Sequence, residues 1–295
     1  MTRILITGIT GYIGSNLARE LLENCQVYGL VREPIRTDYI ADIQERLHLM
    51  PFDGSYESME AVLREARPDL VYHLATHYTG AHGAKETPSL IASNITMGAY
   101  LLEAMVAVGG PPMVYASTVM AHYKEKEYCP LNLYAATKQA FSDLLAYYTD
   151  AGLLRAVTLT LSDTYGPNDH RPKVLNLIKR AIRTGGSLGL SSGQQDYDAT
   201  YIDDVVQAFR LAGEQMIKGA WHNGQFQICP ENPLTLRETV ELMLQVNGLT
   251  LDAVWGQNPA PQREIRQAVR IYPILPGWKP QVSLSEGLRR FYIKS

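Results

Sequence analysis

Short apolar runs alternate with amphipathic stretches along the first half of the chain. The runs predict buried strands, and stretches with apolar residues every three or four positions predict helices. The expected strands are residues 3–7, 26–32, 47–52, 70–75, 113–116 and 155–161. The expected helices are residues 15–24, 58–67, 96–108 and 134–151. This rhythm is typical of βαβ units, in which right-handed crossovers connect parallel strands.

The second half of the chain has a looser pattern, because nine prolines between Pro167 and Pro280 break it into short pieces. Helical patterns remain at residues 174–184, 202–215, 236–246 and 284–292. We therefore expect an α/β fold with a doubly wound parallel (Rossmann) sheet in residues 1–161. Residues 162–295 are expected to form a smaller α/β substrate-binding cap, with some segments returning to the first domain.

The composition excludes several classes of protein. With 46% hydrophobic and 19% charged residues, the chain of 295 residues is not disordered as a whole. A net charge of −3 without long charge runs predicts no nucleic-acid partner. No apolar stretch approaches the ~20 residues of a membrane helix, so no membrane association is expected. Three scattered cysteines predict neither a disulfide framework nor a metal site, and they favour the cytoplasm.

A glycine-rich turn follows the first predicted strand and opens the first predicted helix. Glycines allow a sharp turn and close approach of the backbone to a pyrophosphate, and N–H groups at a helix start attract anions. The turn therefore predicts a dinucleotide site. The residues expected to line it are Gly8, Thr10, Gly11, Tyr12, Ile13 and Gly14.

The end of the second predicted strand bears on which dinucleotide binds. An acidic residue there suits the ribose 2′-hydroxyl of NAD, whereas arginine suits the 2′-phosphate of NADP. Arg32 stands at this place with Arg36 nearby, which favours NADP(H), although two solvated surface arginines are the simpler interpretation. Glu33 keeps NAD(H) as the alternative. Asp53, followed by Gly54 after the third strand, is expected to accept from the adenine amino group or to serve in a turn.

A tyrosine and a lysine stand four positions apart at the start of the predicted helix 134–151. Tyr134 and Lys138 therefore share one helix face. A neighbouring cation, together with the positive charge of a nicotinamide nearby, is expected to lower the phenol pKa from about 10 toward neutrality, which predicts a general acid/base. Lys138 can also hold the nicotinamide ribose. Ser117 and Thr118, at the end of the fifth strand, offer a hydroxyl to a substrate oxygen or cap the strand end.

These elements together resemble the extended short-chain dehydrogenase/reductase family, which comprises nucleotide-sugar epimerases, dehydratases and 4-ketoreductases. Further matching stretches occur in order along nearly the whole chain, at residues 71–75, 94–98, 164–167, 201–205 and 275–280. The resemblance implies that Leu74, Ala75 and Thr76 lie beside the cofactor. It also implies that Asn94 supports the active site at the cofactor.

The same resemblance implies catalytic roles. Tyr134 is expected to be the acid/base, Lys138 its partner, and Thr118 the second hydroxyl on the sugar C4 oxygen, with Ser117 as the lesser candidate. The family's 4,6-dehydratases carry Asp-Glu after this threonine, where this chain has residues 119–120 without an ionisable group, so dehydration is disfavoured.

The segment 163–173 resembles bacterial 4-ketoreductases that make CDP-linked dideoxysugars. A nucleoside-diphosphate sugar is the implied partner. Basic side chains suit its phosphoryl oxygens, so Arg171, Lys173 and Arg263 are expected to clamp the diphosphate, although each can be an ordinary surface charge. The implied substrate-binding residues are Thr118, Asp163, Thr164, Tyr165, Arg171, Lys173 and Arg263.

Net reduction is the favoured function, because cells keep NADPH as the reducing pool and Arg32 favours NADP. We expect reduction of the C4 keto group of a nucleotide-linked 4-keto-6-deoxy sugar. The alternatives are an NAD-dependent nucleotide-sugar 4-epimerase and a non-catalytic NADP-binding regulator. The predicted helices 96–108 and 134–151 carry apolar residues on more than one face, which predicts a homodimer, as in relatives whose matching helices form the interface. The alternative is a monomer in which these residues pack within one chain.

Overall fold

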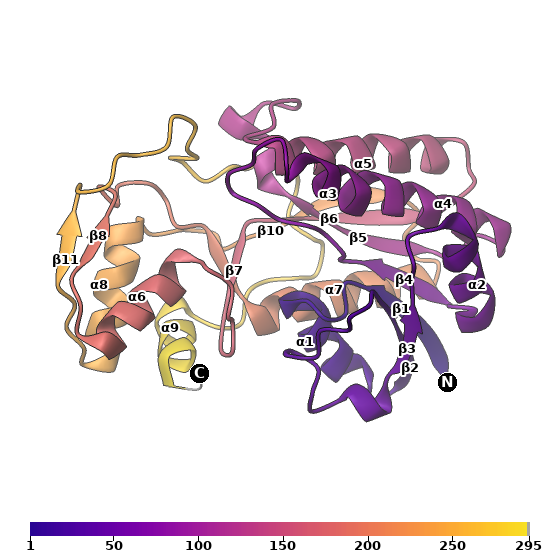
Figure 1. The fold of residues 1–295 in the computed structure, drawn as a ribbon, viewed down its shortest axis with the longest axis horizontal. Helices are drawn as coiled ribbons and strands as arrows, with labels where there is room; N and C mark the ends of the chain where they lie inside the picture. The colour runs from indigo at the N-terminus through magenta and orange to yellow at the C-terminus, as the bar shows by residue number, and fades with distance from the viewer. Residues whose placement is uncertain (294–295) are drawn as a thin grey trace.

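The computed structural model describes residues 1–293 and contains a sheet of seven parallel strands (Figure 1). Their order is β10-β6-β5-β4-β1-β2-β3. From β1 the chain builds outward to β2 and β3, then returns to the other side of β1 and builds outward from β4. The order therefore reverses between β1 and β4, where sheets of this kind bind ligands beyond the carboxyl ends of their strands. This topology confirms the predicted doubly wound parallel sheet.

Six of the seven strands lie within two residues of the predicted bounds. They are β1 (Thr2–Thr7), β2 (Cys25–Val31), β3 (His48–Pro51), β4 (Leu70–His73), β5 (Met113–Thr118) and β6 (Ala156–Leu161). The seventh, β10 (Gly224–Ile228), pairs with β6 and was not predicted. Its Gln227 is fully buried. The protein tolerates this polar side chain there because its amide donates to the Val269 carbonyl at 2.6 Å and accepts from Ile271 N at 3.1 Å. A glutamine at a buried position interrupts the run of apolar residues from which a buried strand is predicted.

Helices cover both faces of the sheet. They are α1 (Tyr12–Leu21), α2 (Tyr56–Ala66), α3 (Thr87–Ile91), α4 (Met97–Ala107), α5 (Leu133–Asp150) and α7 (Ile202–Ile217). Short 3₁₀ turns lie at η1 (Gln44–Arg46), η3 (Val119–Ala121) and η4 (Tyr123–Glu125). Helix α1 begins three residues before the predicted start at residue 15, because Gly11 acts as its N-cap.

One helical stretch is longer than predicted. A π-helical turn, η2 (Ala92–Thr96), joins α3 to α4, so the helix spans Thr87–Ala107 instead of 96–108. These 21 residues, with a hydropathy of 1.4, are long and apolar enough to cross a membrane, which corrects the expectation that no apolar stretch approaches this length. Half of the most apolar window is buried inside the protein, as in the core helix of a globular domain.

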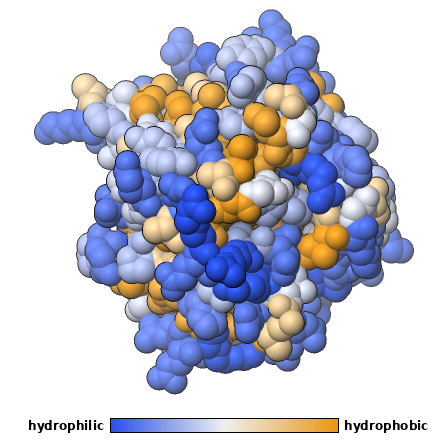
Figure 2. All heavy atoms as spheres, turned by 90° about the vertical axis from the view of Figure 1, so that its right-hand side faces the viewer, coloured by the Kyte–Doolittle hydropathy of each residue, from blue (hydrophilic) through white to orange (hydrophobic). Residues whose placement is uncertain are grey.

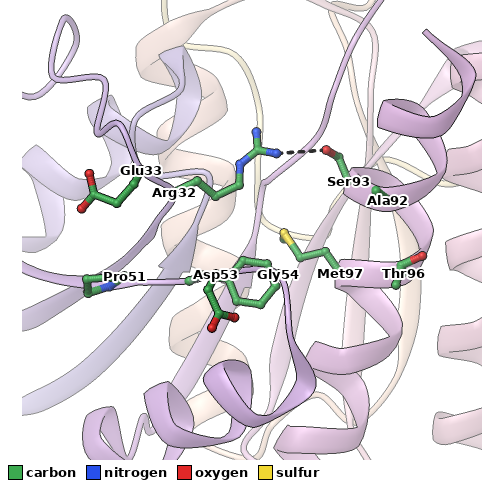
Figure 3. A pocket seen from close by; sticks show the side chains of 10 residues that line it. Arg32, Glu33, Pro51, Asp53, Gly54, Ala92, Ser93, Thr96 and Met97 are labelled. Atoms are coloured by element: carbon green, nitrogen blue, oxygen red, sulfur yellow. Dashed lines mark hydrogen bonds between the residues drawn. The ribbon is translucent and has the colours of Figure 1, made fainter. Parts of the chain in front are cut away.

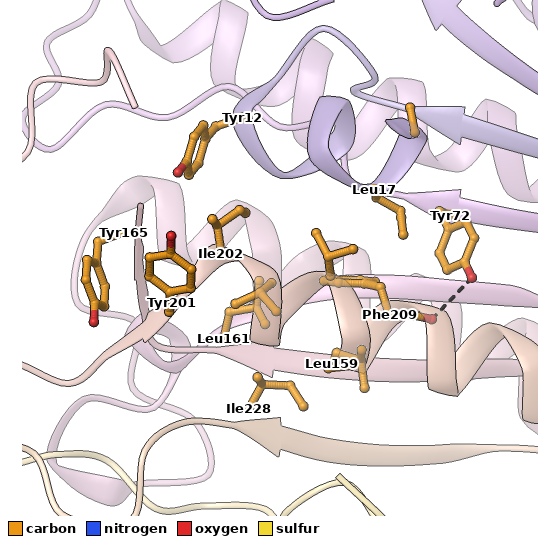
Figure 4. Close-up of a cluster of buried hydrophobic side chains, with 14 of the residues drawn as sticks. Tyr12, Leu17, Tyr72, Leu159, Leu161, Tyr165, Tyr201, Ile202, Phe209 and Ile228 are labelled. Carbon is orange, nitrogen blue, oxygen red and sulfur yellow. Dashed lines mark hydrogen bonds between the residues drawn. The ribbon is translucent and has the colours of Figure 1, made fainter. Parts of the chain in front are cut away.

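The sheet separates two hydrophobic cores. Alternate residues of a strand point to opposite faces, so Ile4 and Ile6 of β1 belong to one core and Leu5 to the other. The first core contains side chains of α1 and α7, and the second contains those of α2, α4 and α5. Figure 4 shows part of the first core, where Tyr72 of β4 donates a hydrogen bond to the Phe209 carbonyl of α7 at 3.2 Å.

The remaining elements form the cap, most of which lies at the left of Figure 1. They are β7 (Asp163–Tyr165), α6 (Val174–Thr184), β8 (Leu188–Leu190), β9 (Ala199–Tyr201), α8 (Leu236–Asn247), β11 (Ala253–Trp255) and α9 (Leu284–Ile293). Strand β7 pairs with β9, and β8 pairs with β11. Between these segments the chain returns to the sheet twice, as α7, which packs against α1, and as β10.

The apolar residues behind the expected homodimer are buried within one chain. Their exposed fractions are 0% for Leu101, Met105 and Phe141, 4% for Leu145 and 7% for Tyr148. They belong to the second core, between the sheet and helices α4 and α5, and so they offer no surface to a second copy. This corrects the reasoning from the sequence. On the face that Figure 2 shows, apolar side chains gather in separate groups between hydrophilic ones.

Candidate active site

The glycine turn after β1 is too tight for larger residues. A Cβ on Gly14 would lie 2.2 Å from the Gly8 carbonyl oxygen, and one on Gly8, whose φ is +77°, would lie 2.6 Å from Ala75 N. The turn is closed by a hydrogen bond from Gly11 N to Gly8 O at 2.9 Å. Because α1 starts at Tyr12, the N–H groups of Tyr12, Ile13 and Gly14 have no acceptor within the helix and can bind an anion.

A pocket of about 490 Å³ opens beside the ends of β2 and β3 (Figure 3). Its size suits one part of a dinucleotide. It is lined by Arg32, Glu33, Pro51, Phe52, Asp53, Gly54, Ala92, Ser93, Thr96 and Met97. The structure thus brings three of the expected cofactor residues, Arg32, Asp53 and Gly54, and the NAD-favouring Glu33 to one place. Arg36 does not line the pocket, because its side chain is 82% exposed and pairs with Asp38 at 3.5 Å.

Two polar side chains of this pocket already have protein partners. Arg32 Nη1 donates to Ser93 Oγ at 3.3 Å, which directs the guanidinium across the pocket (Figure 3). Asp53 Oδ1 accepts from Ser55 Oγ and N at 2.6 and 2.8 Å, and these bonds lower the pKa of its carboxyl. Asp53 therefore has a role in the turn, as the alternative from the sequence had it.

The π-helical turn η2 connects this pocket to the centre of the site. A π turn changes the direction of successive side chains, and such turns are frequent at functional sites. Ser93 faces the pocket, whereas the next residue, Asn94, is buried and bonds to the segment after β4. Its Oδ1 accepts from Thr76 Oγ1 at 3.1 Å and from His77 N at 2.7 Å. Asn94 therefore holds the segment after β4 in place.

Helix α5 carries the expected acid/base pair. The side chain of Asn132 accepts from Ala135 N at 2.9 Å and caps the helix, which fixes Tyr134 in its first turn. Lys138 lies one turn further, 3% exposed, with Nζ 4.3 Å from the centroid of the Tyr115 ring. No hydrogen bond or ion pair within residues 1–293 uses this ammonium, so its donors are available to a ligand.

The phenol is not activated in the protein alone. Burial raises the pKa of Tyr134 to about 12, and the hydrogen bond of Thr76 and the charge of Arg171 offset this only in part. This direction holds for the protein without coenzyme, so the expected lowering beside a bound nicotinamide stays a prediction. Burial lowers the pKa of Lys138 itself to about 7, so its charge is partial at neutral pH. Tyr134 is a neutral proton donor in this state.

We expect Lys138→Met to be more stable than the wild type at pH 7, with an advantage that shrinks toward pH 9. Between the folded pKa of about 7 and the unfolded value of about 10.4, the unfolded chain binds more protons. The wild type therefore gains up to about 1.4 kcal/mol per pH unit as the pH rises, and the variant does not. Urea unfolding followed by circular dichroism at pH 7, 8 and 9 measures this difference. A constant difference across this range would contradict the lowered pKa.

The strand-end hydroxyls differ in their surroundings. Thr118 Oγ1 accepts from Met120 N at 3.2 Å, which caps the turn η3. This bond uses a lone pair, so the hydroxyl can still donate its hydrogen to a substrate oxygen. Capping and substrate binding, weighed as alternatives from the sequence, are therefore compatible for Thr118. Ser117 is 8% exposed and lies by the Tyr115 hydroxyl.

Three expected substrate-binding residues surround the half-buried carboxylate of Asp163. Lys173 pairs with Asp163, and both Lys173 Nζ and Arg171 Nη2 donate to the Thr164 carbonyl, at 3.3 and 3.0 Å. Burial opposes ionisation of Asp163, but the charges of Lys173 and Arg171 outweigh it and lower the pKa of the carboxyl. The side chain of Tyr165 is 3% exposed and packs in the first core, so it contributes to folding instead of the expected contact with substrate.

Arg171 also joins the cap to the glycine turn. Its guanidinium lies 4.6 Å from the centroid of the Tyr12 ring and forms two bonds of 2.7 Å with Asp169. The Tyr12 hydroxyl donates to the Pro167 carbonyl at 3.0 Å, across 155 positions of sequence. No hydrogen bond within the described chain uses Arg171 Nη1, which leaves one edge of the guanidinium for a ligand.

Arg263 has protein partners of its own. Its Nη2 donates to the Pro130 carbonyl at 2.8 Å, and its guanidinium lies 4.9 Å from the centroid of the Tyr123 ring. It therefore connects the C-terminal segment to the chain between β5 and α5, and its printed hydrogen bonds share no partner with those of Arg171 or Lys173. The diphosphate clamp of three cations stays a prediction.

Sequence reasoning missed several residues of the site. Ser93 and Met97 line the pocket, and the Tyr78 ring lies edge-on to the Tyr134 ring with centroids 4.9 Å apart. His73 is buried, and its Nδ1 lies 2.7 Å from Thr7 Oγ1. Their places in the sequence could have indicated them. Ser93 precedes the expected residue Asn94, and Tyr78 follows a strand that ends where the strand order reverses.

Comparisons with known proteins agree with this geometry. The sequence model of the NAD dependent epimerase/dehydratase family matches residues 4–229. CDP-abequose synthase of Yersinia pseudotuberculosis is 30% identical, over 84% of this chain and 87% of the relative. A probable UDP-glucuronate 4-epimerase of Rhizobium meliloti (strain 1021) is 23% identical, over 98% and 95%. The crystal structure of UDP-glucuronic acid 4-epimerase from Bacillus cereus with UDP-glucuronic acid and NAD superposes with a TM-score of 0.84 at 23% identity, covering 98% and 97% of the chains, which shows the fold alone.

Proposed function

Because the chain belongs to the NAD-dependent epimerase/dehydratase family, within the extended short-chain dehydrogenases/reductases, we propose that it reduces a nucleotide-linked 4-keto-6-deoxy sugar at C4 with NADPH. A hydride adds to C4 and a proton adds to the C4 oxygen, which converts the ketone to an alcohol. The likeness to a CDP-abequose synthase supports a sugar reductase. The likeness to a 4-epimerase supports a reaction at carbon C4 of the sugar.

The residues present fit a dinucleotide. The first N–H groups of α1 have no acceptor within the helix, and a pocket lined by Arg32 lies at the ends of β2 and β3. When bound, the nicotinamide supplies the hydride. The N–H groups of Tyr12, Ile13 and Gly14 hold the diphosphate at the start of α1.

Protonation of the C4 oxygen depends on side chains of α5 and of the end of β5. Tyr134 holds a proton on its hydroxyl, as the pKa of about 12 requires, and gives it to the developing alkoxide at C4. The Thr118 hydroxyl donates a hydrogen bond to the same oxygen. Lys138 Nζ would hold a ribose hydroxyl of the bound coenzyme. Val119 and Met120 follow Thr118 and have no ionisable group, which argues against dehydration.

Arg32 is the observation that favours reduction over epimerisation. Its guanidinium lines the pocket beside Asp53 and the end of β2, where it can pair with a 2′-phosphate. A reductase must exchange oxidised for reduced coenzyme in each cycle, and NADPH is the pool kept for reduction. Glu33 lines the same pocket and favours the rival, an epimerase that retains NAD.

The deciding experiment mixes the protein and NADPH with a panel of nucleoside-diphosphate 4-keto-6-deoxy sugars and follows reduced-nicotinamide absorbance. We expect stoichiometric loss of absorbance with one sugar. An epimerase would instead copurify with NAD and interconvert two sugars without consuming added coenzyme. A protein that binds NADPH but turns over no sugar would be the third alternative, a non-catalytic regulator, which the intact Tyr134 and Lys138 argue against.

We expect Arg32→Gln to weaken NADPH binding by about tenfold or more while leaving NADH binding nearly unchanged, because a charged hydrogen bond to a phosphate contributes about 1.5–3 kcal/mol. Dissociation constants from fluorescence titration measure the effect. Arg36→Gln is the matched control, since Arg36 lies outside the pocket, and both affinities should stay within about twofold. Equal weakening of NADH and NADPH by Arg32→Gln would contradict the role in selectivity.

A homodimer remains part of the proposal, although the residues first expected to form it are buried. The exposed apolar residues near those helices are Ile91, 39% exposed, and Tyr147, 63% exposed. We expect a second copy to pack on this side of the protein. Sedimentation of the wild type and of a Tyr147→Lys variant tests this, and an unchanged monomer in both would reject it.

A further inference from the structure

The Lys138 ammonium lies on the face of a buried aromatic ring. Its Nζ is 4.3 Å from the centroid of the Tyr115 ring, and both residues are buried. Within residues 1–293, no hydrogen bond or ion pair uses this Nζ. The electron-rich face of the ring is therefore the partner that the protein itself offers to the buried charge.

Three contacts fix the orientation of the Tyr115 ring. Its hydroxyl donates to the Lys138 carbonyl at 3.2 Å, so the ring is also joined to the lysine backbone. The His73 ring stacks with it at 5.6 Å between centroids and 20° between planes, and the Phe141 ring lies at 4.6 Å. The Tyr115 ring cannot turn away from the ammonium without losing these contacts.

A glycine on α4 makes room for this packing. A Cβ on Gly98 would lie 2.4 Å from Phe141 Cδ2 and 2.5 Å from its Cε2, so a larger residue would displace the Phe141 ring. Phe141 lies about one turn after Lys138 on α5 and contacts Tyr115. The stretch 94–98 therefore ends in a residue that supports the ring beside Lys138.

An aromatic partner leaves more of the ammonium free than a carboxylate would. A carboxylate accepts hydrogen bonds from the ammonium, whereas a ring face attracts the charge without an oxygen acceptor. The N–H donors of Lys138 then remain for a ligand. Burial lowers the pKa of Lys138 to about 7, and attraction to the ring opposes this lowering, because it stabilises only the charged form.

We propose that Tyr115 is a positioning residue whose ring face keeps the Lys138 ammonium charged and in place before a ligand takes up its N–H donors. The proposal rests on the proposed function in that the ligand is the ribose of the coenzyme. Tyr115 acts through Lys138, since it is itself buried in the second core.

The titratable neighbours that Lys138 has in the described part of the chain are neutral at pH 7. Burial, with the charge of Lys138, lowers the pKa of His73 on β4 to about 3, so this ring adds no positive charge. Burial raises the pKa of Tyr134, one turn earlier on α5, to about 12. Burial also raises the pKa of Tyr115 well above its usual range. Neither phenol supplies a negative charge, so the attraction comes from the ring face.

The test measures the ionisation of Lys138 in the coenzyme-free full-length protein. Lysines labelled with carbon-13 at Cε report their charge by NMR, and the Lys138 signal is identified by its loss in Lys138→Met. Tyr115→Phe keeps the ring face, so the midpoint should stay within about 0.3 pH units of the wild type. Fluorines withdraw electron density from a ring face. Three of them on the ring of this variant should lower the midpoint by about one pH unit, a tenfold change in the ionisation constant.

Tyr72 provides the matched control. It is also a buried tyrosine on a strand, and its hydroxyl also donates to a helix carbonyl, that of Phe209 at 3.2 Å. Its side chain belongs to the first core, on the other side of the sheet from Lys138. The same fluorinated ring at position 72 should therefore leave the Lys138 midpoint unchanged.

Equal midpoints with and without ring fluorines in the folded Tyr115→Phe protein would overturn the proposal, and so would an equal shift from the fluorinated ring at position 72. If the fluorinated ring prevents folding, Tyr115→Leu removes the ring and is compared with Tyr72→Leu under the same expectation. The measurement needs neither coenzyme nor substrate. A protein that reduces no sugar can therefore still show the shift, and the failure of one proposal is distinguishable from the failure of the other.

Discussion

Tyr134→Phe should lower kcat by about a thousandfold, within the range of 10²–10⁴ that a general acid contributes. The change removes the proton that the pKa of about 12 keeps on the phenol, and no other donor on α5 replaces it, because Lys138 is committed to the ribose in the proposed site. The ring can stay in place, since its edge-on contact with Tyr78 does not use the hydroxyl.

The experiment compares kcat and the NADPH dissociation constant on the substrate that the panel identifies. Tyr292→Phe is the matched control, because Tyr292 lies on α9 in the cap and its ring contact with Lys179 does not use the hydroxyl. We expect the control to retain wild-type turnover and both variants to bind NADPH with unchanged affinity. Full activity in folded Tyr134→Phe would remove Tyr134 from the mechanism, while loss of coenzyme binding would show a structural effect.

The second large effect is expected from Gly14→Ala. The new Cβ would lie 2.2 Å from the Gly8 carbonyl oxygen and 3.0 Å from Ile9 Cα, so the turn must open. Opening it moves the N–H groups of Tyr12 and Ile13 away from the diphosphate. Loss of two hydrogen bonds to a charged group costs about 3–6 kcal/mol, so NADPH should bind at least about a hundredfold more weakly.

Isothermal titration calorimetry with NADPH measures this loss, and circular dichroism shows whether the fold is kept. Gly186→Ala is the control, because its Cβ would meet nothing closer than Thr184 Oγ1 at 3.6 Å and its φ is not in the left-handed region. The control should bind NADPH as the wild type does. A folded Gly14→Ala protein with wild-type affinity would mean that the coenzyme does not lie against this turn.

The parts of the site that were readable from the sequence depend on short-range chemistry. Glycines at three-residue spacing after an apolar strand are needed wherever the backbone turns this tightly, and the Cβ distances at Gly8 and Gly14 show why. Tyr134 and Lys138 share a helix face because of helical periodicity alone. The NADP preference, the site residues and the substrate remain predictions, which the experiments above address.

Other features followed from residues far apart in the sequence. Whether an arginine faces a ligand or a protein carbonyl is decided by what packs beside it, and Arg263 finds the carbonyl of Pro130, 133 positions away. Burial by the surrounding chain raises the pKa of Tyr134 in the protein without coenzyme, an effect that the spacing of Tyr134 and Lys138 could not indicate. Tyr165 was expected to bind the substrate, but its side chain packs in the first core.

The sequence by itself determined the parallel sheet and the place of the glycine turn within it. Hydrophobic periodicity and turn preferences depend on residues that are close in sequence, so the sequence alone is enough to recognise them. Only the tertiary structure decided that β10 completes the sheet and that Asn94 accepts a hydrogen bond from Thr76. It also decided that the apolar side chains of α4 and α5 pack in the second core of the same chain. Those outcomes depend on which distant surfaces meet, because burial and hydrogen-bond pairing are settled by the packed chain as a whole.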